Sequence, residues 1–218
     1  MGKRTPGLYA VRLFEYMNSD KIILHLCASE FGSDTRDYAA AGYDVRYITK
    51  KIGVENYHPP KNTYAIFANP PCTQFSKANW RVSKRDRAFN EGLKLVKECL
   101  RIIWEAQIDS GAGLKWWALE NPLGYLPQFL GHAPFKYQPW QYGDQSAIAT
   151  KWTCLWGYFN KPDPTVLTRT IAPISKTKVA KQLLFPAARN TNEWANMNES
   201  ERSSASPYFT KQFFLSNP

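Results

Sequence analysis

Hydrophobic residues along this chain gather in short runs of strand length, and each run ends at polar or conformationally special residues. Four runs are rich in β-branched and aromatic side chains: residues 21–27, 43–49, 64–68 and 115–120. Helical segments separate several of them, and the longest predicted helix has apolar residues at helical spacing from Leu93 to about Gln107. Strands that alternate with helices are typical of an α/β protein with a parallel sheet.

The pattern changes toward the C-terminus. Residues 131–144 are rich in Pro, Tyr and Trp and predict irregular structure, whereas residues 151–159 alternate and predict one more strand. Little periodicity follows, until residues 207–216 resume an apolar helix. We therefore expect three parts: a main α/β domain over 1–159, a small irregular lobe over 160–202, and a C-terminal helix within 203–218 that packs back on the main domain.

The ends of two predicted strands carry residues that are suited to chemistry. The run 64–68 leads into Asn69-Pro70-Pro71-Cys72, where the prolines stop the strand because they have no N–H group to donate to a neighbour. The run 115–120 ends in Glu120-Asn121-Pro122. Carboxyl ends of parallel strands meet at one edge of a sheet, where open α/β sheets bind ligands, so Cys72 and Glu120 are predicted to lie side by side.

Each of these two residues also has a simpler interpretation. A lone cysteine at a strand end is most often buried and inert. Glu120 alone could be an acid that the dipole of a helix N-terminus favours. A cysteine on a rigid turn suits a nucleophile, however, and a carboxyl group beside it suits a proton donor or acceptor. The presence of both at strand ends favours catalysis.

A second candidate site follows the first predicted strand. Small residues with a single glycine, Gly32, come after residues 21–27, and then a short helix, Gly42 and the next strand. This order is half of a nucleotide-binding α/β unit, in which backbone amides and a helix N-terminus can hold a polar ligand group. The signal is weak, because Gly-x-Gly-x-x-Gly is absent and any βαβ unit has this order.

The chain is strongly basic, with 28 Lys and Arg against 18 Asp and Glu and a formal net charge of +10. A polyanionic partner is therefore expected, and the many aromatic residues make nucleic acid the first candidate. Basic residues follow the Cys72 turn around Trp80: Lys77, Arg81, Lys84, Arg85 and Arg87. They predict a mobile segment that closes on a nucleic-acid backbone, although a solvated loop has the same composition.

Cysteine spacing and hydropathy argue against several classes of protein: zinc proteins, disulfide-rich proteins and membrane proteins. The cysteines at positions 27, 72, 99 and 154 are far apart, with no Cys-x-x-Cys pair, which argues against a zinc site and a disulfide framework. No apolar run reaches the roughly eighteen residues of a membrane span, and no apolar segment of a signal peptide follows the basic start. We expect no metal, no membrane association and a cytoplasmic location.

Taken together, the two strand ends resemble a known family. Pro70-Pro71-Cys72-Thr73-Gln74-Phe75-Ser76 is similar to the Pro-Pro-Cys-x-x-Phe-Ser loop of DNA cytosine-5 methyltransferases, and Glu120-Asn121-Pro122 to their Glu-Asn-Val/Pro element. The short forms found in phages and prophages are the most similar, also in the tail from Arg202 onward. The resemblance implies a Rossmann-like S-adenosylmethionine-dependent methyltransferase fold, with a mostly parallel sheet, helices on both faces and a reduced irregular lobe.

The resemblance also implies a mechanism and a partner, DNA. Cys72 would add to carbon 6 of a cytosine that is flipped out of the duplex, and Glu120 would donate a proton at ring nitrogen 3. Carbon 5 would then attack the methyl group of the cofactor, S-adenosylmethionine. Residues 160–202 would be a reduced target-recognition region, so a short or relaxed recognition sequence is expected.

The remaining site residues follow from the same resemblance. Cofactor binding is expected from Leu26, Cys27, Ala28, Ser29, Phe31, Gly32, Thr49, Asn69 and Pro70. Contacts with DNA are expected from Pro71, Gln74, Phe75, Ser76, Lys77, Arg81, Lys84, Arg85, Asn121, Lys151 and Thr153. The family usually has an acid at the end of its second strand and another in its first, where this chain has Thr49 and His25.

Three other interpretations stay open. Asn69-Pro70-Pro71 begins the Asn-Pro-Pro-aromatic motif of exocyclic-amine methyltransferases, although Cys72 stands at the aromatic position. Modification of a free deoxycytidine nucleotide would use the same chemistry without a polymer. From another class, the chain could be a catalytically inactive DNA-binding relative that masks sites or acts as a decoy.

Overall fold

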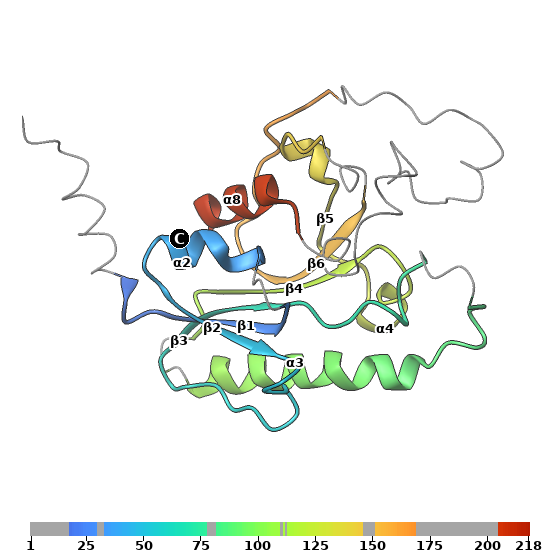
Figure 1. Ribbon diagram of the computed structural model, residues 1–218, viewed down its shortest axis with the longest axis horizontal. Coiled ribbons are helices and arrows are strands. Elements are labelled where there is room, and N and C mark those ends of the chain that lie inside the picture. The colour runs from blue at the N-terminus through green and yellow to red at the C-terminus, as the bar shows by residue number, and fades with distance from the viewer. Residues whose placement is uncertain are drawn as a thin grey trace, which may run out of the picture.

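A computed structural model of the protein describes residues 18–29, 33–77, 82–109, 111, 113–145, 151–168 and 205–218. In this part of the chain, six strands form one sheet in the order β2-β1-β3-β4-β6-β5 (Figure 1). The strands are β1 (Ile22–Ala28), β2 (Asp44–Thr49), β3 (Thr63–Ala68), β4 (Trp116–Pro122), β5 (Phe135–Tyr137) and β6 (Thr153–Tyr158). The protein is thus of the α/β class, as the alternating pattern predicted.

The sheet is mixed, not mostly parallel as predicted. The pairs β1–β2, β1–β3 and β3–β4 are parallel, whereas β6 is antiparallel to both of its neighbours, β4 and β5. The prediction was wrong because side-chain alternation marks β6 as a strand but does not encode its direction. Strand β5 was also missed within residues 131–144, since three residues are too few to show a period.

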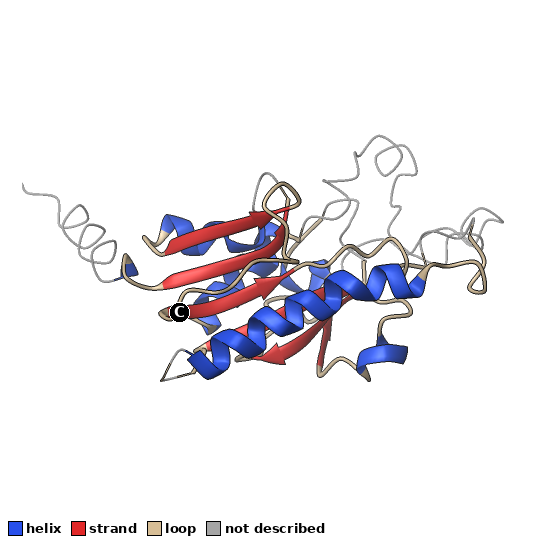
Figure 2. Ribbon diagram, turned by 90° about the horizontal axis from the view of Figure 1, so that it is seen from below, coloured by secondary structure: helices blue, strands red, loops and turns tan. Residues whose placement is uncertain are grey.

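Helices cover both faces of this sheet, and each face buries alternate side chains of the strands. Helix α3 (Phe89–Asp109) lies across one face, where Leu24 and Leu26 pack with its Val96 and Ile102 (Figure 2). The other face is covered by η1 (Ser33–Thr35), α2 (Arg36–Ala40) and α8 (Pro207–Ser216). The short helices α4 (Pro127–Leu130) and η2 (Pro139–Tyr142) lie between β4 and β6 in the chain.

The C-terminal helix α8 is held on the sheet by aromatic packing. The ring of Phe209 stacks on that of Tyr137, with centroids 3.6 Å apart, and Phe213 contacts Phe67 and Trp116 edge-on. The Tyr38 hydroxyl donates to the backbone oxygen of Asn217 just beyond the helix, 2.8 Å away. The last described residues therefore complete the core of the sheet.

The strand order also identifies where a ligand crevice forms. From β1 the chain goes to β2 on one side, and β3 then pairs on the other side of β1. Strand order thus reverses between β1 and β3, and open α/β sheets bind ligands outside the carboxyl ends of the strands at such a point. Both Ala28, at the end of β1, and the turn after β3 lie at this edge.

Replacement of Phe209 by alanine tests the packing of α8. Phe209 is fully buried and Tyr208 beside it is 53% exposed. Phe209→Ala should lower the free energy of unfolding by about 3–5 kcal/mol, because it leaves a cavity in the aromatic layer. Tyr208→Ala is the matched control and should change it by less than about 0.5 kcal/mol. Urea unfolding followed by circular dichroism measures both; equal effects would contradict this account of the core.

Candidate active site at the carboxyl edge of the sheet

The parallel register of β3 and β4 brings two predicted site segments together. Ala68 pairs with Leu119, so the residues that follow, Asn69 and Glu120, are neighbours at the sheet edge. Nδ2 of Asn69 lies 3.4 Å from Oε2 of Glu120. Since Cys72 follows Asn69 by three residues, its Cα is within about 11 Å of that of Asn69.

A short turn holds Cys72 in place after β3. The carbonyl oxygen of Cys72 accepts hydrogen bonds from the backbone N–H groups of Phe75 and Ser76, at 2.9 and 2.7 Å. Phe75 is completely buried and packs against the rings of Phe89 and Phe129. The buried ring of Phe75 thus fixes the turn to the hydrophobic core. Cys72 itself is half-buried.

The guanidinium group of Arg87 fixes the same turn from the other side. Its Nη1 donates to the carbonyl oxygens of Gln74 and Ser76, both at 3.0 Å, with that of Thr73 at 3.5 Å. Arg87 is only 7% exposed. Arg87 was predicted to belong to a mobile basic segment that closes on nucleic acid. It is instead buried, because its guanidinium group donates hydrogen bonds to backbone carbonyl groups of the Cys72 turn.

A close backbone contact joins the Cys72 turn to the segment that follows Glu120. The N–H group of Tyr125 donates to the carbonyl oxygen of Phe75 at 2.8 Å, and Asn121 Nδ2 donates to that of Pro70 at 2.9 Å. A Cβ atom on Gly124 would lie 2.1 Å from the Phe75 oxygen, so only glycine fits there. The two strand ends therefore form one rigid unit.

The carboxyl group of Glu120 has the electrostatics of a proton donor near neutral pH. Burial raises the pKa of Glu120 to about 7; Lys151 lowers it, Asp34 raises it, and the Asn69 amide lowers it. Only 7% of Glu120 is exposed, so the desolvation of its charged form dominates. A carboxyl group that titrates near 7 can both donate and accept a proton at physiological pH.

A buried polar chain continues from Glu120 toward β1. Nε2 of His25 lies 3.0 Å from Oδ1 of Asn69, and Nδ1 lies 3.0 Å from the hydroxyl of Thr35. Asp34 Oδ2 is 3.5 Å from Nε2. Burial lowers the pKa of His25 and raises the pKa of Asp34, so burial favours the neutral form of both groups.

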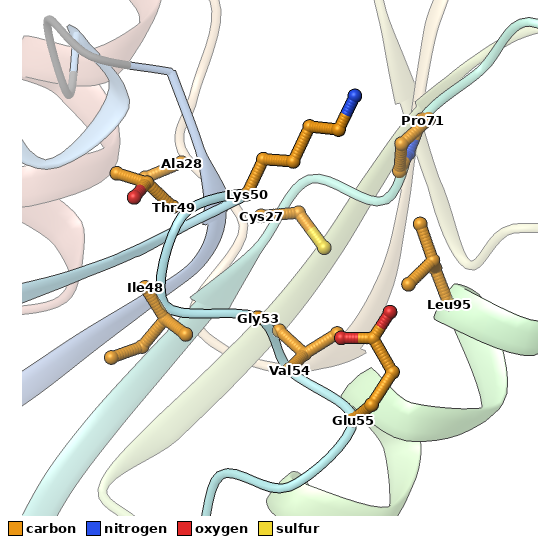
Figure 3. Close-up of a pocket in the computed structure, with 10 residues that line it drawn as sticks. All are labelled: Cys27, Ala28, Ile48, Thr49, Lys50, Gly53, Val54, Glu55, Pro71 and Leu95. Carbon is orange, nitrogen blue, oxygen red and sulfur yellow. The ribbon is translucent and has the colours of Figure 1, made fainter.

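A cavity of about 330 Å³ lies at the carboxyl ends of β1 and β2. It extends from Ala28 and Thr49, at these strand ends, to Pro71, which precedes Cys72 (Figure 3). Figure 3 also shows the Cys27 sulfur and the Glu55 carboxyl group turned toward the same space. The other lining residues are Ile48, Lys50, Gly53, Val54 and Leu95.

The chemistry of this lining fits a nucleoside-like ligand. Apolar side chains supply surface for a flat ring system, and the Thr49 hydroxyl and the Glu55 carboxylate can accept hydrogen bonds from sugar hydroxyl groups. A carboxylate also suits a ligand that carries a positive charge. S-Adenosylmethionine has all three features, so the residues present fit this cofactor.

The predicted cofactor residues fall into three groups. Cys27, Ala28 and Thr49 line the cavity, and so does Pro71, which was predicted to contact DNA. Leu26 and Pro70 are buried, Ser29 directly follows β1, and the Asn69 side chain faces His25 and Glu120 instead. Phe31 and Gly32 lie outside the described residues.

The predicted DNA contacts divide in the same way. Four of them are buried and cannot reach a ligand at the surface: Phe75, Ser76, Asn121 and Thr153. Three basic residues are exposed: Lys77, Lys84 and Arg85. Gln74 accepts a hydrogen bond from the backbone of Ala88 through its side-chain oxygen. Lys151 is half-buried and its charge acts on Glu120, while Arg81 lies outside the described residues.

Several site residues were not found from the sequence. The amino groups of Lys77 and Lys84 each lie 5.7 Å from the centre of the Tyr125 ring, so Tyr125 gathers both cations beside the Cys72 turn. Glu55 and Lys50 follow β2 within a polar connector that has no distinguishing pattern. Gly124 was one available signal, as a glycine two residues after the Glu120-Asn121-Pro122 motif.

Comparison with known proteins adds no family assignment. The chain matches no protein-family model, and no curated protein sequence matches it significantly. Within the described residues, no group of three or more His, Cys, Asp or Glu side chains could hold a metal ion. None of the helices in that same part of the chain is long and apolar enough to cross a membrane.

The raised pKa of Glu120 predicts a pH-dependent stability. Between its ordinary value of 4.5 and about 7, the folded state binds more protons than the unfolded state, so the free energy of unfolding falls as the pH rises through this window. Glu120→Gln removes the charge and should therefore be more stable than wild type at pH 8, by up to about 3 kcal/mol. At pH 4.5 the two should differ little.

Thermal or urea unfolding at both pH values measures this difference. Glu91→Gln is the matched control, since Glu91 is 64% exposed on α3 and pairs with Lys94 at the surface. It should follow wild type at both pH values. A Glu120→Gln variant that is less stable than wild type at pH 8 would mean that the carboxylate is well solvated or paired.

Proposed function

We propose that this protein is a DNA methyltransferase that transfers a methyl group from S-adenosylmethionine to carbon 5 of cytosine. The observation that carries the proposal is the juxtaposition at the sheet edge. Pro71 closes the cavity at β1 and β2, Cys72 follows it on a fixed turn, and Glu120 lies on the adjoining strand end with a pKa of about 7. Cofactor, nucleophile and acid would then share one place.

Cys72 would act first, as the nucleophile. Its thiolate adds to carbon 6 of the flipped-out cytosine, which makes carbon 5 electron-rich enough to attack an electrophile. A nucleophile reacts faster when it is held next to the carbon it attacks, so the fixed position of the turn would supply part of the rate enhancement. The hydrogen bonds of Phe75, Ser76 and Arg87 to this turn provide that rigidity.

Glu120 would stabilise the charge that the addition places on the ring. A protonated Glu120 donates to ring nitrogen 3 as the thiolate adds, and the carboxylate takes the proton back when the thiolate leaves. S-Adenosylmethionine, when bound, supplies the electrophilic methyl group. The proton on carbon 5 is then lost to a base, and elimination of Cys72 restores the aromatic ring.

The fold and the charge support the same proposal. The order β2-β1-β3-β4, with its reversal between β1 and β3, also occurs in doubly wound sheets, and it supports the Rossmann-like fold that we propose. A duplex must present its base in an extruded form, and exposed Lys77, Lys84 and Arg85 beside the turn can bind the phosphates that flank it. All four cysteines are thiols, in keeping with the reducing cytoplasm that we propose as its location.

The exocyclic-amine alternative has less support. Its motif would use the Asn69 amide and an aromatic residue at position 72 to hold the base. In this structure the amide faces His25 and Glu120, and position 72 is cysteine. An inactive DNA-binding relative would need neither Cys72 nor a carboxyl group that titrates near 7.

A covalent trap tests the nucleophile. DNA that contains 5-fluorocytosine should form a stable adduct with the protein when S-adenosylmethionine is present, because fluorine at carbon 5 blocks the elimination of Cys72. Cys72→Ser should lose the adduct and at least about 1,000-fold in methylation rate, since a hydroxyl is far less ionised than a thiol. Denaturing gel shift and mass spectrometry of the adduct peptide measure the first effect.

Cys99→Ala is the matched control, because Cys99 is a buried cysteine on α3 and should leave the adduct intact. Full methylation by Cys72→Ser would eliminate the covalent mechanism. Tight DNA binding by the wild-type protein with no adduct and no methylation would instead identify the inactive DNA-binding relative. Bisulfite sequencing of DNA from expressing cells reports base position and sequence context together.

DNA affinity should depend steeply on salt. Binding that neutralises phosphates releases counterions, so the logarithm of the association constant should fall linearly with the logarithm of salt concentration. Lys84→Ala should make this slope less negative by about one, as one phosphate contact is lost. Lys97→Ala, exposed on α3, is the control and should leave the slope unchanged. A flat response in the wild-type protein would favour a free nucleotide as substrate.

A further inference from the structure

Four polar side chains form a chain of contacts that runs through the sheet edge to Glu120. Thr35 and His25 are fully buried, Asn69 follows β3, and Glu120 ends the chain on β4. Apolar layers surround most of these groups. A buried polar group destabilises the folded state unless it has a hydrogen-bond partner. Each of these side chains therefore has to keep the partner that it has in this structure.

The hydrogen-bond partners indicate which nitrogen of His25 carries the hydrogen atom and which way the Asn69 amide faces. Nε2 of His25 faces Oδ1 of Asn69 at 3.0 Å and Oδ2 of Asp34 at 3.5 Å, so Nε2 carries the hydrogen and donates. Nδ1 is then the acceptor for the Thr35 hydroxyl at 3.0 Å. With its oxygen held by His25, the Asn69 amide presents Nδ2 to Oε2 of Glu120 as a donor.

We propose that His25 and Asn69 are positioning residues for Glu120. His25 fixes which way the Asn69 amide faces, and that amide donates a hydrogen bond to the Glu120 carboxyl group. The chemical role of this pair rests on the proposed function of Glu120 as the acid. In this chain, His25 would thus serve the catalytic carboxyl group from β1, two strands away from it in the sheet.

The physical consequence is control over the protonation of Glu120. Burial favours the carboxylic acid, whereas an amide donor favours the carboxylate. The pair therefore limits the effect of burial and keeps the group able to give up its proton and take it back. Without the donor, Glu120 would hold its proton more tightly and be a weaker acid toward the base.

Other ionisable groups also act on Glu120 and have to stay constant in a test. Asp34 of η1 and Lys151 before β6 act on its charge, and the charge of Glu120 in turn raises the pKa values of Tyr137 of β5 and Cys154 of β6. Substitution of Asn69 leaves all four in place. Substitution of His25 also removes a neighbour of Asp34, so Asn69 is the primary position.

The test is the titration of the Glu120 carboxyl carbon, followed by ¹³C NMR and assigned with Glu120→Gln. Asn69→Ala removes the donor and should raise the pKa of Glu120 by about one unit. His25→Phe keeps an aromatic ring between Tyr47 and Phe67 but releases the amide, and should raise the pKa in the same direction. The double variant should shift no further than Asn69→Ala, because His25 acts through Asn69.

Asn18→Ala is the matched control, since its buried side chain also donates an amide hydrogen bond, to the Ala41 carbonyl oxygen after α2 and not to Glu120. It should leave the Glu120 titration unchanged. An unchanged pKa in both Asn69→Ala and His25→Phe, or fully additive shifts in the double variant, would overturn the proposal. If Asn69→Ala does not fold, Asn69→Leu, which keeps the approximate size of the side chain but removes the amide donor, should give the same upward shift, and its absence would overturn the proposal.

The titration needs neither DNA nor cofactor, so it tests the pair independently of methyltransferase activity. The pH profile of methylation then tests the link between the two. If Glu120 is the acid, activity falls as the pH rises through its pKa, and this limb should move upward in Asn69→Ala by the same amount as the titration. A shifted titration with an unshifted limb would leave the pair intact and remove Glu120 as the acid.

Discussion

The parallel pairing of β3 with β4 is the constraint on which the rest of the site depends. A shift of this register by one residue would turn every side chain of one strand to the opposite face and separate Asn69 from Glu120. Hydrogen bonds beyond the strands hold the register: Asn121 to Pro70, and Tyr125 to Phe75. Segments about fifty residues apart in the sequence thus behave as one rigid structure.

The hydrogen bonds that hold this edge are made by polar side chains that are buried in the protein interior. Four side chains, those of Arg87, His25, Asp34 and Glu120, are at most 7% exposed, which is unfavourable for charged forms unless partners replace water. The partners differ in kind. The guanidinium group of Arg87 donates hydrogen bonds to backbone oxygens, whereas burial shifts the pKa values of the other three groups toward their neutral forms. Burial thus brings the pKa of Glu120 to about 7, where the group can give up and take back a proton at physiological pH.

The sequence predicted those features that depend on local pattern. Four apolar runs became β1 to β4, the helical spacing from Leu93 became part of α3, and two proline-rich strand ends became neighbours because parallel strands end at one edge. Features that depend on tertiary contact were not predictable. The direction of β6, the inward turn of Arg87 and the contact of Asn69 with His25 follow from which segments meet in space, and no spacing in the sequence encodes them.

The cavity at the ends of β1 and β2 illustrates the same distinction. The residue at the end of β2 is Thr49, so the strand end itself provides no carboxylate. The tight turn after β2 changes this, because Gly53 adopts a φ of 78° and brings the chain back over the strand end. Glu55 then lines the cavity together with Thr49. Which groups share a cavity is decided by contacts in space, so a carboxylate six residues later in the chain can line the cavity beside Thr49.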